Sequence, residues 1–155
     1  MPTRTSLSKT LIVLLAATSA LGPAAMQILL PALPVIKATF EVSTEVAQLT
    51  LSLSMLAIAL GTLFFGPVSD KYGRKPVMLL GLSITLVGSI FCFLANTIEL
   101  LIAGRFIQAF GAAVGLVLAR SIVRDVYAAQ EAARVIATLV MVMVVAPMLS
   151  PALGG

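Results

Sequence analysis

The chain has 155 residues, of which 60% are hydrophobic and only 10% are charged, and its formal net charge is +4. A soluble domain carries roughly 25% charged residues, so this composition excludes a water-soluble globular fold and makes membrane lipid the expected surroundings. With no histidine and a single cysteine, Cys92, the sequence also excludes His-based catalysis and a clustered Cys/His metal site, and no cofactor is expected.

The predicted elements, in chain order, are five apolar helices over residues 11–36, 46–69, 76–98, 100–120 and 134–155. Each is long enough to cross a bilayer, which takes roughly 20 residues in an α-helix. The connections are short and charged and leave no room for a soluble domain. The predicted fold class is therefore an all-α membrane protein with about five transmembrane helices, forming one unit over 1–155. The basic residues show no aromatic interleaving, so nucleic acid is not an expected partner.

The first apolar stretch has two interpretations. Arg4 and Lys9, followed by apolar residues and the small residues 18–20, resemble a signal peptide. The apolar run continues to Ile36, however, well beyond an h-region of roughly 7–15 residues, which favours a retained spanning helix. Its three prolines predict a bend. Gln27 lies near its middle and needs hydrogen-bond partners inside the bundle, and a ligand contact and a helix–helix contact are equally open.

The turn between the second and third stretches contains a cluster of candidate residues: Gly66, Asp70, Gly73, Arg74 and Lys75. Gly73 can supply a positive φ for a tight turn. Asp70 can accept hydrogen bonds from the start of the next helix or pair with Arg74, and such a clip could hold helix ends together in one state only. The alternative is that the cations only set the topology, and both interpretations can hold at once.

Arg105 is the one charged residue within the fourth stretch. A charge near the centre of a spanning helix costs at least ~2.5–3.5 kcal/mol, and such residues usually face a cavity or a transport path. Arg105 and Gln108 share a helix stripe, which favours a pathway role over the alternative of snorkelling to the outer surface. Gly111 and Gly115 form a G-x-x-x-G pair, for which helix packing is the favoured interpretation.

The fifth stretch is rich in helix-weakening residues: Pro147, Ser150, Pro151, Gly154 and Gly155. Two prolines remove two helix hydrogen bonds, and the glycines relax the backbone further. The interpretations are a bend that shapes a central cavity or simple packing against neighbouring helices.

Cationic residues fall unequally on the two sides of the predicted membrane. If the five stretches alternate in direction, one side receives eight of the ten, namely Arg4, Lys9, Lys71, Arg74, Lys75, Arg120, Arg124 and Arg134. The other side receives Lys37, with Arg105 set aside as intramembrane. Because Lys and Arg are in excess in cytoplasmic loops, we expect a cytoplasmic N-terminus.

Three of these patterns resemble signatures of the major facilitator superfamily. The turn from Gly66 through Lys75 is similar to its motif between the second and third helices. Arg105, Gln108 and Gly111 resemble its fourth-helix motif. Residues 146–155 are similar to its fifth-helix antiporter motif, with Ala146 and Ser150 in place of two glycines.

The match is closer still to the Bcr/CflA-type multidrug efflux branch, on residues 30–34, 105–109 and 119–125. This resemblance covers nearly the whole chain. It implies a bacterial inner-membrane exporter that exchanges protons for drugs or small metabolites by alternating access. It also implies twelve helices, of which this chain would supply the first five, an incomplete N-terminal six-helix half. The missing C-terminal half is then expected to be required for function.

In that interpretation Arg105, Gln108 and Gln27 line the path, and Asp70 and Arg74 lock the inner gate. Gln27 stands where the branch commonly has Asp. Since glutamine cannot titrate, either the proton-carrying carboxylate lies in the missing half or the energy source differs.

The functional hypothesis is secondary transport, with efflux of small amphipathic or cationic-to-zwitterionic molecules. The alternative is a non-transporting structural fragment that requires a partner chain, because five helices cannot form a two-half machine alone. The apolar ending at Gly155 favours a truncated sequence. An enzyme is not expected, because the chain has no nucleophile–base pair.

Overall fold

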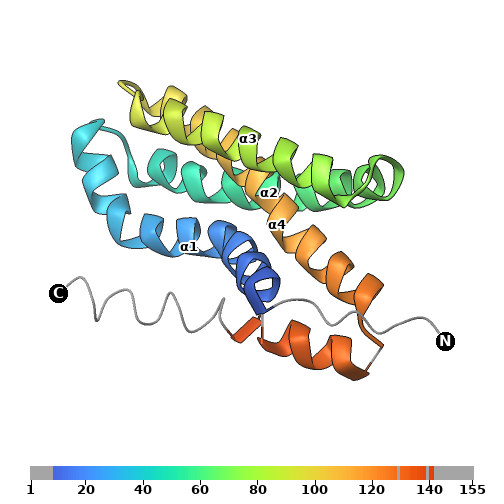
Figure 1. Ribbon diagram of the computed structural model, residues 1–155. Helices are drawn as coiled ribbons and strands as arrows, with labels where there is room; N and C mark the ends of the chain where they lie inside the picture. Colours follow the sequence, from blue (N-terminus) through green and yellow to red (C-terminus); the bar gives the residue numbers. More distant parts are fainter. Residues whose placement is uncertain (1–8, 129, 139, 142–155) are drawn as a thin grey trace.

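The computed structural model describes residues 9–128, 130–138 and 140–141, and all regular structure in them is helical (Figure 1). The elements are α1 (Lys9–Thr39), α2 (Thr44–Tyr72), α3 (Arg74–Phe93) and α4 (Ile98–Val126). Residues 130–138 and 140–141 are helical as well. By length and composition α2, α3 and α4 can each span a membrane, and α1 is a fourth span if its two bent arms act as one. The all-α membrane fold class is thus confirmed.

The helix ends differ from the expected ones in both directions. α4 continues six residues beyond the expected end at Arg120, through Arg124 and Asp125. α3 stops at Phe93, five residues before the expected end at 98. Charges mark where a helix leaves hydrocarbon, not where its hydrogen bonding ends, which explains the longer α4. The fifth expected helix, 134–155, lies mostly outside the described residues.

Local caps fix two of the short connections. The Ser43 Oγ accepts a hydrogen bond from the Val46 backbone N–H at 3.4 Å, and the Thr97 Oγ1 accepts one from Leu100 at 3.3 Å. Each hydroxyl satisfies a donor at a helix N-terminus that would otherwise lack a partner. Gly73 forms the break between α2 and α3 with φ +93°, a conformation that L residues other than glycine rarely adopt.

α1 is bent, as its prolines predict. The arms Val13–Gln27 and Leu29–Thr39 meet at 45°. Pro31 lies inside the helix and has no N–H to donate to the carbonyl of Gln27 four residues earlier, and a proline ring at this position crowds that carbonyl, which is a usual cause of a helix kink. The bend is therefore attributed to the proline at position 31.

α4 is the central helix and packs against α1, α2 and α3 (Figure 1). Small residues let the neighbours approach its backbone closely. A Cβ added at Gly111 would lie 2.6 Å from the Gly81 carbonyl of α3, whereas one at Gly115 would collide with the Thr18 carbonyl of α1. The predicted G-x-x-x-G pair thus sits in close packing contacts, and its two glycines face different helices.

Candidate functional site

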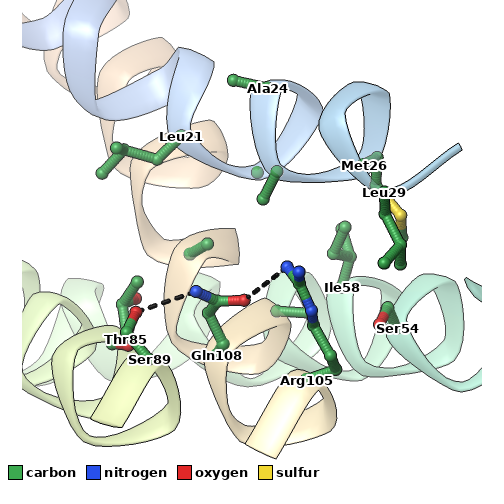
Figure 2. A pocket seen from close by; sticks show the side chains of 14 residues that line it. Leu21, Ala24, Met26, Leu29, Ser54, Ile58, Thr85, Ser89, Arg105 and Gln108 are labelled. Atoms are coloured by element: carbon green, nitrogen blue, oxygen red, sulfur yellow. Dashed lines mark hydrogen bonds between the residues drawn. The ribbon is translucent and has the colours of Figure 1, made fainter. Parts of the chain in front are cut away.

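A cavity of about 270 Å³ lies where the four helices meet (Figure 2). Its lining is mostly apolar, with polar groups gathered on α3 and α4. The lining residues are Leu21, Gly22, Ala24, Ala25, Met26, Leu29, Ser54, Ile58, Thr85, Ser89, Arg105, Gln108, Ala109 and Ala112. An apolar pocket with a few convergent polar groups is the usual form of a small-molecule site.

A directional hydrogen-bond relay runs along the wall of this cavity from α4 to α3. Arg105 Nη1 donates to Gln108 Oε1 at 3.0 Å, and Gln108 Nε2 donates to Ser89 Oγ at 2.8 Å (Figure 2). The Ser89 hydroxyl donates in turn to the Thr85 backbone carbonyl at 2.9 Å. Because that bond uses the hydroxyl proton, Ser89 can only accept from Gln108. The amide oxygen of Gln108 is therefore turned toward Arg105.

Among the described residues, Arg105 has no carboxylate partner that would balance its charge. Its guanidinium reaches from α4 into the space beneath α1 (Figure 2). Of its five donors, the Nη1–H bonds Gln108, whereas its Nε is buried with no hydrogen-bond partner. In the part of the chain that the structure describes, no carboxylate lines the cavity beside it. A cation held inside hydrocarbon by one neutral amide is electrostatically incomplete.

Gln27 lies apart from this group. Its side chain is exposed and it is not among the lining residues, although its neighbours Met26 and Leu29 are. The structure thus brings Arg105 and Gln108 together, as their shared stripe predicts, and does not bring Gln27 to them.

A second polar cluster joins three helices around Arg74. Its guanidinium pairs with Asp70 Oδ1 of α2 at 2.8 Å and with Asp125 Oδ2 of α4 at 3.2 Å. It also donates to the Ser69 Oγ at 2.6 Å. The Asp70–Arg74 contact is the clip considered from the sequence. Asp125 extends that clip to α4.

The other predicted residues of this turn occupy simpler positions. Lys75 is exposed, and Lys71 lies over the ring of Tyr72, 5.3 Å from its centroid. Gly66 faces open space, since nothing lies within 4 Å of a Cβ added there. The fifth-helix candidates, Pro147 to Gly155, lie outside the described residues.

Sequence reasoning missed Ser89 and Thr85 in the relay and Asp125 at the Arg74 cluster. Ser89 and Thr85 are ordinary in an apolar helix, and only the register of α3 against α4 gives them a role. Asp125 is separated from Arg74 by 51 residues, but its position among the cations after the fourth stretch was an available signal. Across the described part of the chain, no group of three acidic or thiol side chains could hold a metal ion.

The fold and this site define a multi-pass helical membrane protein with a cationic, hydrogen-bonded pocket inside its bundle. The chain belongs to the Major Facilitator Superfamily, whose sequence pattern matches residues 15–155. This membership agrees with the resemblance seen in the three motifs.

The relatives are transporters by name. The chain is 38% identical over 142 residues to the uncharacterized MFS-type transporter YdgK of Bacillus subtilis, covering 92% of this chain and 35% of YdgK. It is 39% identical over 135 residues to an uncharacterized transporter of Rickettsia bellii, covering 87% and 33%. It is 36% identical over 134 residues to the multidrug resistance protein MdtL of Escherichia coli, covering 86% and 34%. No solved structure matches the chain. The chain thus spans about a third of the length of these relatives.

Proposed function

We propose that the chain is the N-terminal part of a secondary transporter of the Bcr/CflA multidrug type, which exports drugs or small amphipathic metabolites. The observation that carries this proposal is the half-buried Arg105 on a cavity lined by α1, α2, α3 and α4. An intramembrane charge facing a cavity is the usual mark of a substrate path. The 36% identity to MdtL, a multidrug resistance protein, supports the choice of substrate class.

In this proposal the relay positions the substrate-contacting groups. Gln108 is held by Ser89, so its oxygen orients the guanidinium of Arg105 across the cavity. Leu21, Met26 and Leu29 of α1 supply apolar surface opposite that charge. A molecule with an apolar body and one polar end fits such a lining.

The Arg74 cluster would act as the gate at the opposite end of the bundle. It holds the end of α2, the start of α3 and the end of α4 together through two ion pairs and one hydrogen bond. Contacts of this kind can be made in one state of an alternating-access cycle and broken in the other. Following the distribution of lysine and arginine, we place this gate at the cytoplasmic face of a bacterial inner membrane.

Protons are the proposed coupling ion, with their carrier outside this part of the chain. Every Asp and Glu among residues 9–128 lies within three residues of a helix end or in a connection. Gln27, at the position where the resemblance expects Asp, cannot carry a proton. The missing C-terminal part is therefore the proposed source of the titrating group. Nothing in the relatives favours the alternative of a non-transporting fragment.

The test is drug efflux by the complete protein that contains this chain, in bacterial cells lacking their own drug exporters. We expect expression to lower drug accumulation across a panel of amphipathic antibiotics. Arg105→Ala should abolish this effect while membrane insertion, measured by immunoblot of isolated membranes, stays unchanged. Arg134→Ala is the matched control, because Arg134 is an exposed arginine away from the cavity. Normal efflux by Arg105→Ala would contradict the proposed pathway.

A further inference from the structure

The charge balance of the cavity has a consequence for substrate class. Among the described residues that line the cavity, Arg105 is the one with a charged or ionisable side chain. The other polar groups are neutral: the amide of Gln108 and the hydroxyls of Ser54, Thr85 and Ser89. The cavity formed by the described helices is therefore cationic.

The hydroxyls do not compensate this charge, because each donates its proton to a carbonyl of its own helix and none accepts a hydrogen bond from Arg105. Thr85 Oγ1 donates to the Gly81 carbonyl at 2.9 Å, and Ser54 Oγ donates to the Thr50 carbonyl at 2.6 Å. Ser89 donates to Thr85 and accepts from Gln108. Each of these groups is committed to its own helix or to the relay. Beyond the single Nη1 bond, the donors of Arg105 meet no acceptor among the described residues.

From this we infer that the site selects small amphipathic anions, with a carboxylate or sulfonate bound by Arg105 and an apolar body against α1. The inference rests on the proposed function, names the substrate class of the same cavity, and replaces the cationic-to-zwitterionic class considered from the sequence. A planar guanidinium with free donors matches the two oxygens of such an acid. An ammonium ligand would instead meet a like charge in a low dielectric, where repulsion is strong.

The geometry also assigns the relay a positioning role in this selectivity. The Gln108 oxygen accepts from one Nη1–H and so fixes the orientation of the guanidinium, whose tip points toward α1 while its Nε stays buried (Figure 2). Gln108→Glu keeps the shape of the side chain but adds a negative charge. Its carboxylate would take the place of the amide oxygen, which now lies 3.0 Å from Arg105 Nη1. That internal anion would occupy Arg105 and compete with the ligand.

The test compares three probes of nearly equal shape: 2-naphthoate, the neutral 2-naphthamide and the cationic 2-naphthylmethylammonium. Their Kd values are measured by isothermal titration calorimetry on the complete protein in phosphatidylcholine nanodiscs at pH 7. We expect the anion to bind at least about tenfold more tightly than either other probe, the ratio given by one charge-assisted hydrogen bond.

Two variants connect that preference to the cavity. Arg105→Gln and Gln108→Glu should each reduce the anion's affinity to that of the neutral probe, whereas Arg134→Gln should leave all three Kd values unchanged. Because the wild-type ratio is itself a test, a variant that fails to fold leaves the proposal falsifiable.

Equal or tighter binding of the cation or the neutral probe by the wild-type protein would overturn the inference. So would binding of none of the three probes, or an anion preference that survives both variants. If the rest of the transporter supplies a carboxylate to Arg105, the cationic or the neutral probe should bind as tightly as the anion or more tightly. Drug efflux in cells is a separate measurement that any of these binding results leaves open. Failure of this inference is therefore distinguishable from failure of the proposed function.

Discussion

At Gly88 the backbone of α3 lies directly against Gln108, the residue that orients Arg105. A Cβ added to Gly88 would lie 2.6 Å from the Cα of Gln108 and 2.8 Å from its Cβ. Those atoms belong to the backbone and base of a residue in a packed helix, so they cannot rotate away. Any side chain here must push the two helices apart, next to the Ser89–Gln108 hydrogen bond.

We predict that Gly88→Ala destabilises the protein by about 1–3 kcal/mol, the usual effect of overpacking a filled interface. Gly66→Ala is the matched control, because nothing lies within 4 Å of a Cβ at that position. There the exchange should be neutral or stabilising by up to about 1 kcal/mol, since alanine favours the helix over glycine. Thermal unfolding followed by circular dichroism in detergent measures both. Equal melting temperatures for the two variants would contradict the close α3–α4 approach.

Some residues of the site can be predicted from the sequence, and others cannot. Arg105 and Gln108 stand out because a charge and an amide at helical spacing are expensive in hydrocarbon. Ser89 does not, because a serine can satisfy its hydroxyl on its own helix, as this one does with Thr85. Its second role as acceptor for Gln108 depends on the register between two helices, and a hydropathy pattern contains no information on register.

The bend of α1 does not lie at its first proline. The first arm, Val13–Gln27, contains Pro23, yet the 45° change of direction falls beyond it, about one turn before Pro31. The second arm carries Leu29 to the cavity wall, and the first arm carries Leu21 and Met26. The angle between them therefore helps to set the shape of the cavity.

We predict that Pro31→Ala straightens α1, because it restores the hydrogen bond to the Gln27 carbonyl and removes the ring clash. Spin labels at positions 13 and 35, whose side chains are 66% and 64% exposed, should then move apart by about 2 Å. Double electron–electron resonance spectroscopy on the purified, spin-labelled protein measures this change in distance. Pro23→Ala should leave the distance unchanged. An equal shift for the two variants would show that Pro31 is not the cause of the bend.

The ends of the helices are harder to predict from the sequence than their positions along the chain. The expected end of the fourth helix at Arg120 falls six residues short, because the charges of Arg120, Arg124 and Asp125 do not interrupt its hydrogen bonding. Those side chains lie where α4 can leave hydrocarbon without ending. The early stop of α3 at Phe93 leaves four residues of turn before α4, which the minimal turn expected near Asn96 and Glu99 did not include.

At the scale of the whole molecule, the four helices meet around α4, and large apolar side chains cover the outside. Leu63, Leu86 and Phe93 are 74%, 64% and 88% exposed, which only lipid or further protein can cover favourably. The cavity and the Arg74 cluster both include residues of α4. A movement of α4 would therefore change both sites together.

This coupling predicts the effect of Asp125→Asn in the complete protein. The variant removes the ion pair from Arg74 to α4 and keeps the pair to Asp70. Since the Asp125 side chain is 56% exposed, the lost pair contributes only about 0.2–1 kcal/mol. In the proposed alternating-access cycle, that range would shift the open–closed equilibrium by at most about fivefold toward opening at the end where Lys71 and Lys75 lie.

The measurement uses a cysteine placed at Ala25 on the cavity wall, in a Cys92→Ala background. Its rate of alkylation by a membrane-impermeant maleimide, added from the side of Lys71 and Lys75, should rise about 1.4-fold to fivefold in Asp125→Asn. In 1 M salt the unmodified protein should approach the same rate, because charges are then screened beyond about 3 Å. Glu99→Gln removes an exposed carboxylate at the other end of α4 and should change nothing. An unchanged rate in Asp125→Asn would mean that the Arg74 cluster holds the helices together without controlling access to the cavity.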